Sequence, residues 1–65
     1  MSLYTIDVTA LPSDDSTALA LWEFFHNKEL TQKEIVDFIT DMSEDKEYAK
    51  WEFEQLVAIG TIREI

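Results

Sequence analysis

The sequence of 65 residues contains no cysteine, one proline and one glycine. Without cysteine the chain can form neither a disulfide bond nor a zinc–thiolate site, and its composition indicates no redox compartment. It also lacks any apolar run near the roughly 18 residues that cross a bilayer. The amino terminus has neither the basic start nor the apolar core of a secretory signal. We therefore expect a cytoplasmic protein that does not engage a membrane.

Cations are scarce as well. Five lysine and arginine residues stand against 14 aspartate and glutamate residues, so the formal net charge is −9. A chain this acidic is repelled by nucleic acids and anionic membranes and attracted to basic protein surfaces. Residues 1–65 are expected to form a single domain with one core, since 46% of the residues are hydrophobic. Chains of this size bury only about 60% of their unfolded surface, which leaves a thin stability margin.

Both ends of the sequence have the pattern of short strands. In residues 3–10 apolar and polar residues alternate, so Tyr4, Ile6 and Val8 are predicted to share one face of a half-buried strand. Residues 61–65 are rich in β-branched residues and are predicted to be extended. We predict that these two strands pair with each other, because their backbone groups would otherwise remain unpaired.

A first helix is predicted over about residues 17–27, after a turn that begins at Pro12. Ser13 or Ser16 is the expected N-cap. Apolar residues at helical spacing predict its inward side. These are Leu19, Trp22 and Phe25, with Leu21 and Phe24 contributing in part.

A second helix is predicted to begin at Thr31. Thr31 and Glu34 have the spacing of a capping box, and Leu30 and Ile35 that of a hydrophobic staple. Lys33 stands four residues before its opposite charge, Asp37, a spacing that favours an ion pair on the solvent side. The predicted apolar side of this helix consists of Ile35, Val36, Phe38, Ile39 and Met42.

A third helix is predicted to begin at Ser43 and to end at Gly60. Ser43 is the expected N-cap, and Glu44 and Asp45 would interact favourably with the helix dipole. Gly60 can adopt the left-handed conformation that ends a helix. The predicted buried side consists of Ala49, Phe53, Leu56 and Val57. The predicted fold is α+β and mainly α: a helix-turn-helix-like core of three helices whose short N-terminal strand pairs with a short C-terminal strand.

Residues 19–65 resemble a winged helix-turn-helix domain. The resemblance is carried by the segments LWEFF, LTQKEIVDFI and FEQLVAIGTI. It implies that the third helix presents its outward residues to the major groove of DNA. In this sequence four carboxylates and one lysine replace the basic and amide side chains that usually contact phosphates and bases. The sequence stops at Ile65, so we expect no two-stranded wing with a basic tip. The outward residues are Glu44, Asp45, Glu47, Lys50, Trp51 and Glu54.

Residues 41–52 place oxygen-bearing side chains at positions 1, 3, 5, 7 and 12 of an EF-hand loop. The sixth position, where that loop needs glycine, is occupied by Lys46. His26, the one histidine, has no catalytic partner in a recognisable arrangement. We therefore expect no metal, no cofactor and no enzymatic activity. The EF-hand positions correspond to Asp41, Ser43, Asp45, Glu47 and Glu52.

The leading interpretation is a non-enzymatic protein-interaction module that binds a basic surface, such as that of a nucleic-acid-handling enzyme. In charge and size the chain resembles small acidic regulators and inhibitors, including some from phages. Trp51 would anchor the contact, since tryptophan is enriched among binding hot spots. The alternatives are a winged-helix transcriptional regulator that binds DNA and a homo-oligomeric structural domain. The predicted contact residues are Asp41, Glu44, Asp45, Glu47, Trp51 and Glu54; the alternative contact lies on the first helix around Glu23 and His26.

Overall fold

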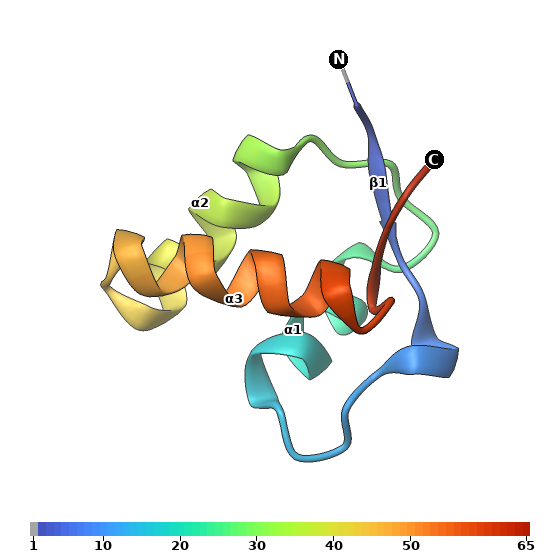
Figure 1. Cartoon of the computed structure of the whole chain (residues 1–65), viewed down its shortest axis with the longest axis horizontal. Coiled ribbons are helices and arrows are strands. Elements are labelled where there is room, and N and C mark those ends of the chain that lie inside the picture. The colour runs from blue at the N-terminus through green and yellow to red at the C-terminus, as the bar shows by residue number, and fades with distance from the viewer. Residues whose placement is uncertain (1) are drawn as a thin grey trace.

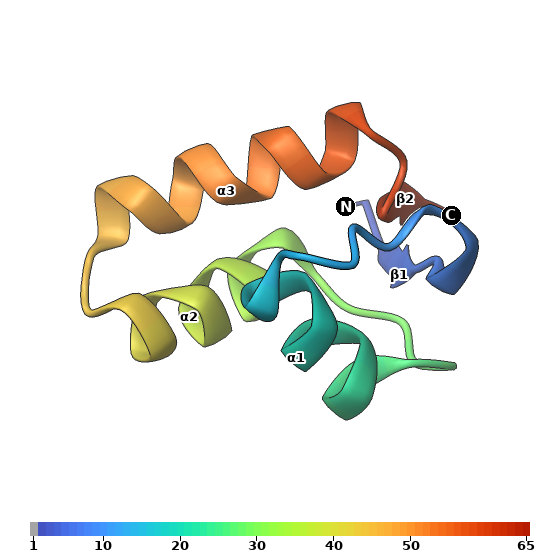
Figure 2. The same cartoon turned by 90° about the horizontal axis from the view of Figure 1, so that it is seen from below.

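The structure, a computed structural model, describes residues 2–65 as three helices and a two-stranded antiparallel sheet. Figures 1 and 2 show α3 lying across α2 and α1, with the sheet at the carboxyl end of α3. This arrangement confirms the predicted α+β, mainly α fold. Within residues 2–65, no helix has the length and apolar character needed to cross a bilayer. The elements are β1 (Tyr4–Ile6), a 3₁₀ helix η1 (Val8–Ala10), α1 (Ser16–Phe25), α2 (Gln32–Ser43), α3 (Lys46–Ala58) and β2 (Ile62–Glu64).

The sheet joins the two ends of the described chain, as predicted. Strands β1 and β2 run antiparallel, with Thr5 opposite Arg63 in the centre of the register. The two ends lie side by side in Figure 1. Tyr4 also exchanges two backbone hydrogen bonds, of 2.7 and 2.9 Å, with Leu30 in the connection between α1 and α2. β1 is thus held on both of its edges.

The first strand is shorter than predicted. β1 ends at Ile6, because the Asp7 carboxylate accepts a hydrogen bond from the Thr9 backbone N–H at 2.9 Å and so begins η1. Such local side-chain hydrogen bonds compete with a strand ladder. Val8 therefore lies exposed in η1 instead of sharing the inward face of Tyr4 and Ile6.

Helix α1 begins and ends differently from the prediction. Its N-cap is Asp15, not Ser13 or Ser16. The Asp15 Oδ1 accepts hydrogen bonds from the backbone N–H groups of Thr17 and Ala18, at 3.0 and 3.2 Å. The helix ends at Phe25, because Asn27 adopts a left-handed conformation with φ of 64°.

The inward side of α1 is rotated from the predicted one. Ala18 and Leu21 are fully buried, whereas Leu19 and Phe24, both expected to face inward, are exposed. The cause is the spacing of Ala18, Leu21 and Phe25, which puts these three residues on one side of the helix. Phe25 and Trp22 are half-buried and pack against the core.

Helix α2 begins as predicted, with both hydrogen bonds of the capping box between Thr31 and Glu34. Ile35, Val36 and Ile39 are buried, and Phe38 is partly buried with its ring centroid 4.9 Å from that of Phe25. The prediction for Met42 is wrong, since this side chain is 47% exposed. Met42 belongs to the last turn of α2, which extends beyond α1 towards the corner with α3 (Figure 2).

The corner between α2 and α3 corrects the predicted start of the third helix. Ser43 is the last residue of α2 and not an N-cap; its hydroxyl donates to the Ile39 carbonyl at 2.8 Å. Glu44 turns the chain with a left-handed φ of 58°. Asp45 is the N-cap of α3 and accepts a hydrogen bond from the Tyr48 backbone N–H at 3.1 Å.

Helix α3 buries Ala49, Phe53 and Leu56, as predicted. Val57 is 38% exposed, so its predicted burial is wrong. It follows Leu56 by one residue, a rotation of about 100° that carries it to the edge of the buried side. Gly60, with φ of 89°, follows the C-cap and leads the chain into β2, as predicted.

The neighbours Leu56 and Val57 provide a matched test of this packing. Leu56→Ala is expected to lower the free energy of unfolding by about 2–5 kcal/mol, because it leaves a cavity in the core. Val57→Ala should cost less than about 1 kcal/mol, since a partly exposed side chain has less to lose. Urea denaturation followed by circular dichroism measures both values. Equal losses for the two variants would contradict the assigned faces of α3.

Candidate functional site

Three of the predicted contact residues share the outward face of α3. Glu47, Trp51 and Glu54 have the spacing that aligns side chains on one side of a helix. All three are exposed, and Trp51 is 53% exposed. This face lies opposite the buried side formed by Ala49 and Phe53.

The other three predicted contact residues lie at the corner where α2 meets α3. Asp41 belongs to the end of α2, and Glu44 is the left-handed corner residue; both are exposed. Asp45 is also exposed, but its carboxylate is engaged by the Tyr48 backbone N–H as the cap of α3. The structure thus brings Glu47, Trp51 and Glu54 together and puts the remaining acids at the amino end of the same helix.

One flank of α3 carries most of the positive charge. The groove between α2 and α3 is lined by Lys33, Lys46 and Lys50, three of the five cations in the sequence. Glu54 stands at the edge of this groove. Lys33 forms the expected ion pair with Asp37, at 2.6 Å. The acidic character of α3 is therefore weakest on the side of α2.

The opposite flank of α3 borders an acidic and aromatic cleft, which we call the α1–α3 cleft. No lining residue of this cleft is cationic, and its volume is about 570 Å³. The rings of Tyr48 and Trp51 both line it, with centroids 5.8 Å apart. The lining consists of Pro12, Asp14, Asp15, Ser16, Thr17, Tyr48, Trp51, Glu52, Gln55, Leu56 and Ile59.

Glu52 is a buried carboxylate of the α1–α3 cleft. Its residue is only 5% exposed, and it accepts a hydrogen bond of 2.5 Å from the Tyr48 hydroxyl. Burial raises the pKa of the Glu52 carboxyl, the Tyr48 hydrogen bond opposes this rise, and the neighbouring Asp15 carboxylate adds to it. The same hydrogen bond raises the pKa of Tyr48.

No cation compensates this buried charge in the part of the chain that the structure describes. The two ion pairs found there join Lys33 to Asp37 and Arg63 to Asp7, both away from the cleft. A buried carboxylate without a cation is costly, and its cost is reduced only by hydrogen bonding or by protonation. The α1–α3 cleft therefore favours a positively charged group.

The sequence pattern does not predict that Glu52, Tyr48 and Asp15 belong to one site. A signal for Glu52 was present, because it lies three residues after Ala49 and four before Leu56, on the buried side of the helix. Its proximity to Asp15 depends on how the segment before α1 packs against α3, which helical periodicity does not contain.

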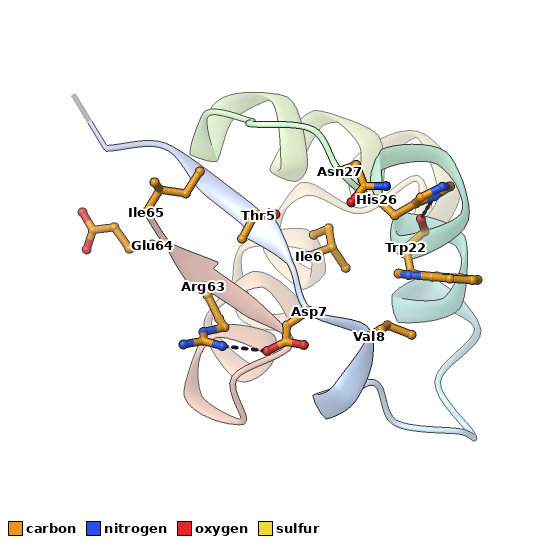
Figure 3. Close-up of a pocket in the computed structure, with 10 residues that line it drawn as sticks. All are labelled: Thr5, Ile6, Asp7, Val8, Trp22, His26, Asn27, Arg63, Glu64 and Ile65. Carbon is orange, nitrogen blue, oxygen red and sulfur yellow. Dashed lines mark hydrogen bonds and ion pairs between the residues drawn. The ribbon is translucent and has the colours of Figure 1, made fainter.

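A third concave surface lies between the sheet and the end of α1 (Figure 3). Trp22 and Val8 line it on one side, and the ion pair between Arg63 and Asp7, at 2.8 Å, on the other. Hydrogen bonds from Thr9 and Arg63 lower the pKa of Asp7 to about 2. Because Arg63 balances Asp7, this cavity carries less net negative charge than the α1–α3 cleft.

His26 is the C-cap of α1 and lines the same concave surface between the sheet and α1. Its Nδ1 is 2.9 Å from the Trp22 carbonyl oxygen, which is the helix-end position expected from the sequence. Glu23 and His26, the alternative contact residues, are both exposed.

The EF-hand spacing does not correspond to a loop. Residues 41–52 form the end of α2, the corner and most of α3. Within residues 2–65, no three histidine, cysteine, aspartate or glutamate side chains gather in a geometry suited to a metal ion.

Comparisons of the chain with protein-family models, with curated proteins and with solved structures each gave no match.

Replacing the buried carboxylate should reveal its cost. The pKa of Glu52 is higher in the folded state than in the unfolded state, because burial disfavours the ionised carboxylate. The folded state is therefore less stable at a pH where Glu52 is ionised than at a pH where it is protonated. Glu52→Gln retains an acceptor for the Tyr48 hydroxyl without the charge. We expect this variant to melt at a higher temperature than the wild type at pH 7, with the difference shrinking as the pH falls towards about 4.

Thermal melts followed by circular dichroism across this pH range measure the effect. Glu54→Gln is the matched control, because it removes the same charge from an exposed position. A difference between Glu52→Gln and wild type that does not change with pH, or that equals the difference for Glu54→Gln, would contradict the buried-charge interpretation.

Proposed function

We propose that this protein is a non-enzymatic interaction module that binds a basic surface of another protein through α3. The observation that carries the proposal is the exposure of Trp51 on a helix face shared with Glu47 and Glu54. A large aromatic side chain that is more than half exposed contributes little to the core. Tryptophan in such a position is well suited to anchor a protein contact.

The distribution of charge supports a basic partner. The net charge of −9 creates self-repulsion that the fold does not require. A basic surface would relieve this repulsion and accelerate association in a salt-dependent manner. Exposed ion pairs contribute only about 0–1 kcal/mol each, so they steer the partner more than they hold it. The ring of Trp51, desolvated on binding, would provide most of the affinity and slow dissociation.

The class of partner follows from the same charge complementarity. Proteins that handle nucleic acids carry extended basic surfaces for phosphate binding. An acidic domain that occupies such a surface would act as a regulator or inhibitor of the nucleic-acid-handling protein. The proposal commits to a protein partner and not to nucleic acid.

Two kinds of substitution should affect the complex differently. Glu47→Gln combined with Glu54→Gln should mainly slow association and flatten its salt dependence, because these charges act at long range. Trp51→Ala should mainly accelerate dissociation, since it removes the desolvated contact. Affinity capture from the native host identifies the partner, and surface plasmon resonance then measures both rates.

The control for this experiment is Glu23→Gln, which removes one exposed carboxylate from α1. All variants are first checked for folding by circular dichroism. Wild-type kinetics for both sets of α3 substitutions, together with an effect of Glu23→Gln, would move the contact to α1 and refute the proposed face.

Duplex DNA should not bind near physiological salt. Non-specific binding requires cations that replace the counterions along the phosphates. Of the five cations, Arg63 and Lys33 are already paired with carboxylates. Fluorescence anisotropy with a labelled duplex at about 150 mM salt should show no saturable binding. A micromolar complex would refute the proposal and favour the DNA-binding alternative.

A further inference from the structure

We infer that the α1–α3 cleft receives one arginine side chain of the basic partner, between the carboxylates of Asp15 and Glu52 and the rings of Tyr48 and Trp51. This inference rests on the proposed function and adds a specific binding pocket beside the outward face of α3. The four side chains converge on the cleft from two elements, α3 and the segment that caps α1.

Two carboxylates of the α1–α3 cleft, those of Glu52 and Asp15, favour a cationic ligand. Glu52 is nearly completely buried; it accepts a hydrogen bond from the neutral hydroxyl of Tyr48, and the neighbouring Asp15 carboxylate raises its pKa. Asp15 uses Oδ1 to cap α1. A guanidinium that contacts both carboxylates would form charge-assisted hydrogen bonds and would supply the charge that the cleft lacks. Binding of the guanidinium would therefore remove the free-energy cost of an unpaired buried carboxylate.

Two aromatic rings of the cleft also favour a cationic ligand. Tyr48 and Trp51 line the same cleft, and their planes are inclined by 38°. A cation above an indole or phenol ring is attracted by the electrons of the ring face. Arginine is favoured over lysine here, because its planar guanidinium can stack on a ring and donate to carboxylates at the same time.

The remaining lining suits the stem of such a side chain. Pro12, Leu56 and Ile59 contribute apolar surface beside the acids. Arginine side chains commonly pack their methylene groups along apolar surface while the charged end reaches polar groups. The cleft thus offers a complementary partner to each part of an arginine side chain.

Three other concave surfaces of the described residues do not offer this combination, and the one between β1 and the start of α2 has no carboxylate among its lining residues. The α2–α3 groove contains three lysines against two carboxylates, Asp37 and Glu54, and Lys33 is paired with Asp37, so its net charge is still positive. In the cavity between the sheet and α1, Asp7 is already bound by Arg63. Charge therefore singles out the α1–α3 cleft for a basic side chain.

The test uses short oligoarginine and oligolysine peptides of equal length as probes. The indole N–H signals of Trp51 and Trp22, followed by two-dimensional NMR, report on two separate sites of the same molecule. Oligoarginine should shift the Trp51 signal saturably and leave the Trp22 signal in place. Oligolysine should bind more weakly, by about tenfold, since it cannot stack and bridge in the same way.

Variants separate a pocket from general surface charge. Glu52→Gln should weaken oligoarginine binding about tenfold, whereas the matched control Glu54→Gln should weaken it only about twofold, because it removes an exposed charge outside the pocket. Trp51→Ala, measured by calorimetry, should abolish the preference for arginine over lysine. This second variant changes an exposed residue and so tests the pocket independently of the buried one.

The outcomes distinguish this inference from the proposed function. Equal effects of Glu52→Gln and Glu54→Gln, or equal binding of the two peptides, would overturn the arginine pocket while leaving a basic partner for α3. A shift of the Trp22 signal instead of the Trp51 signal would also overturn the pocket. Absence of binding by both peptides at low salt would refute the pocket and the proposed preference for basic surfaces together.

Discussion

The pairing of the two chain ends is the interaction on which the other features of this domain depend. Ile6 and Ile62 are buried opposite each other in the sheet, and the Thr61 hydroxyl donates a 2.5 Å hydrogen bond to the Ala10 carbonyl. This bond ties the segment before α1 to the end of α3. The same segment carries Pro12 and Asp15, which line the α1–α3 cleft. The cleft therefore exists because the ends of the sequence are joined.

The two sides of α3 differ in charge, a difference that the net charge of the whole chain does not show. α3 has lysines on the side of α2 and a cleft with carboxylates on the side of α1. A basic partner that approaches α3 would be repelled on one flank and attracted on the other. The domain would thus fix the orientation of its partner as well as attract it. This is the kind of specificity expected from combined attractive and repulsive contacts.

The sequence predicted those features whose causes are local. The capping box of Thr31 and Glu34 and the helix end at Gly60 depend on residues within a few positions of each other, and both are present. The prediction failed where two local signals competed. Ser43 and Asp45 are both good caps, and the chain uses Asp45 because the Ser43 hydroxyl bonds back to its own helix. The second limit is tertiary contact, which local signals do not encode.

The candidate site also combines features with local causes and features that depend on tertiary contacts. The sequence placed Trp51 off the apolar side of α3 and left open whether it is a partly buried edge residue or an exposed one; in the structure it is 53% exposed. The burial of Glu52 also follows from helical spacing, but its position beside Asp15 depends on how the segment before α1 packs near α3. Residues from distant parts of a chain form such a cleft only after the core has oriented both of them, and the sequence pattern of one helix does not contain that information.

The corner between α2 and α3 has a consequence for the balance between stability and binding. Glu44 holds a left-handed backbone with φ of 58°, a conformation that costs a residue with a side chain about 1–2 kcal/mol and costs glycine almost nothing. In a domain with a thin margin this is a substantial part of the total. The corner thus gives up stability to keep a carboxylate at the amino end of α3. A more stable domain is available by the single replacement Glu44→Gly, at the expense of one negative charge on the proposed contact face.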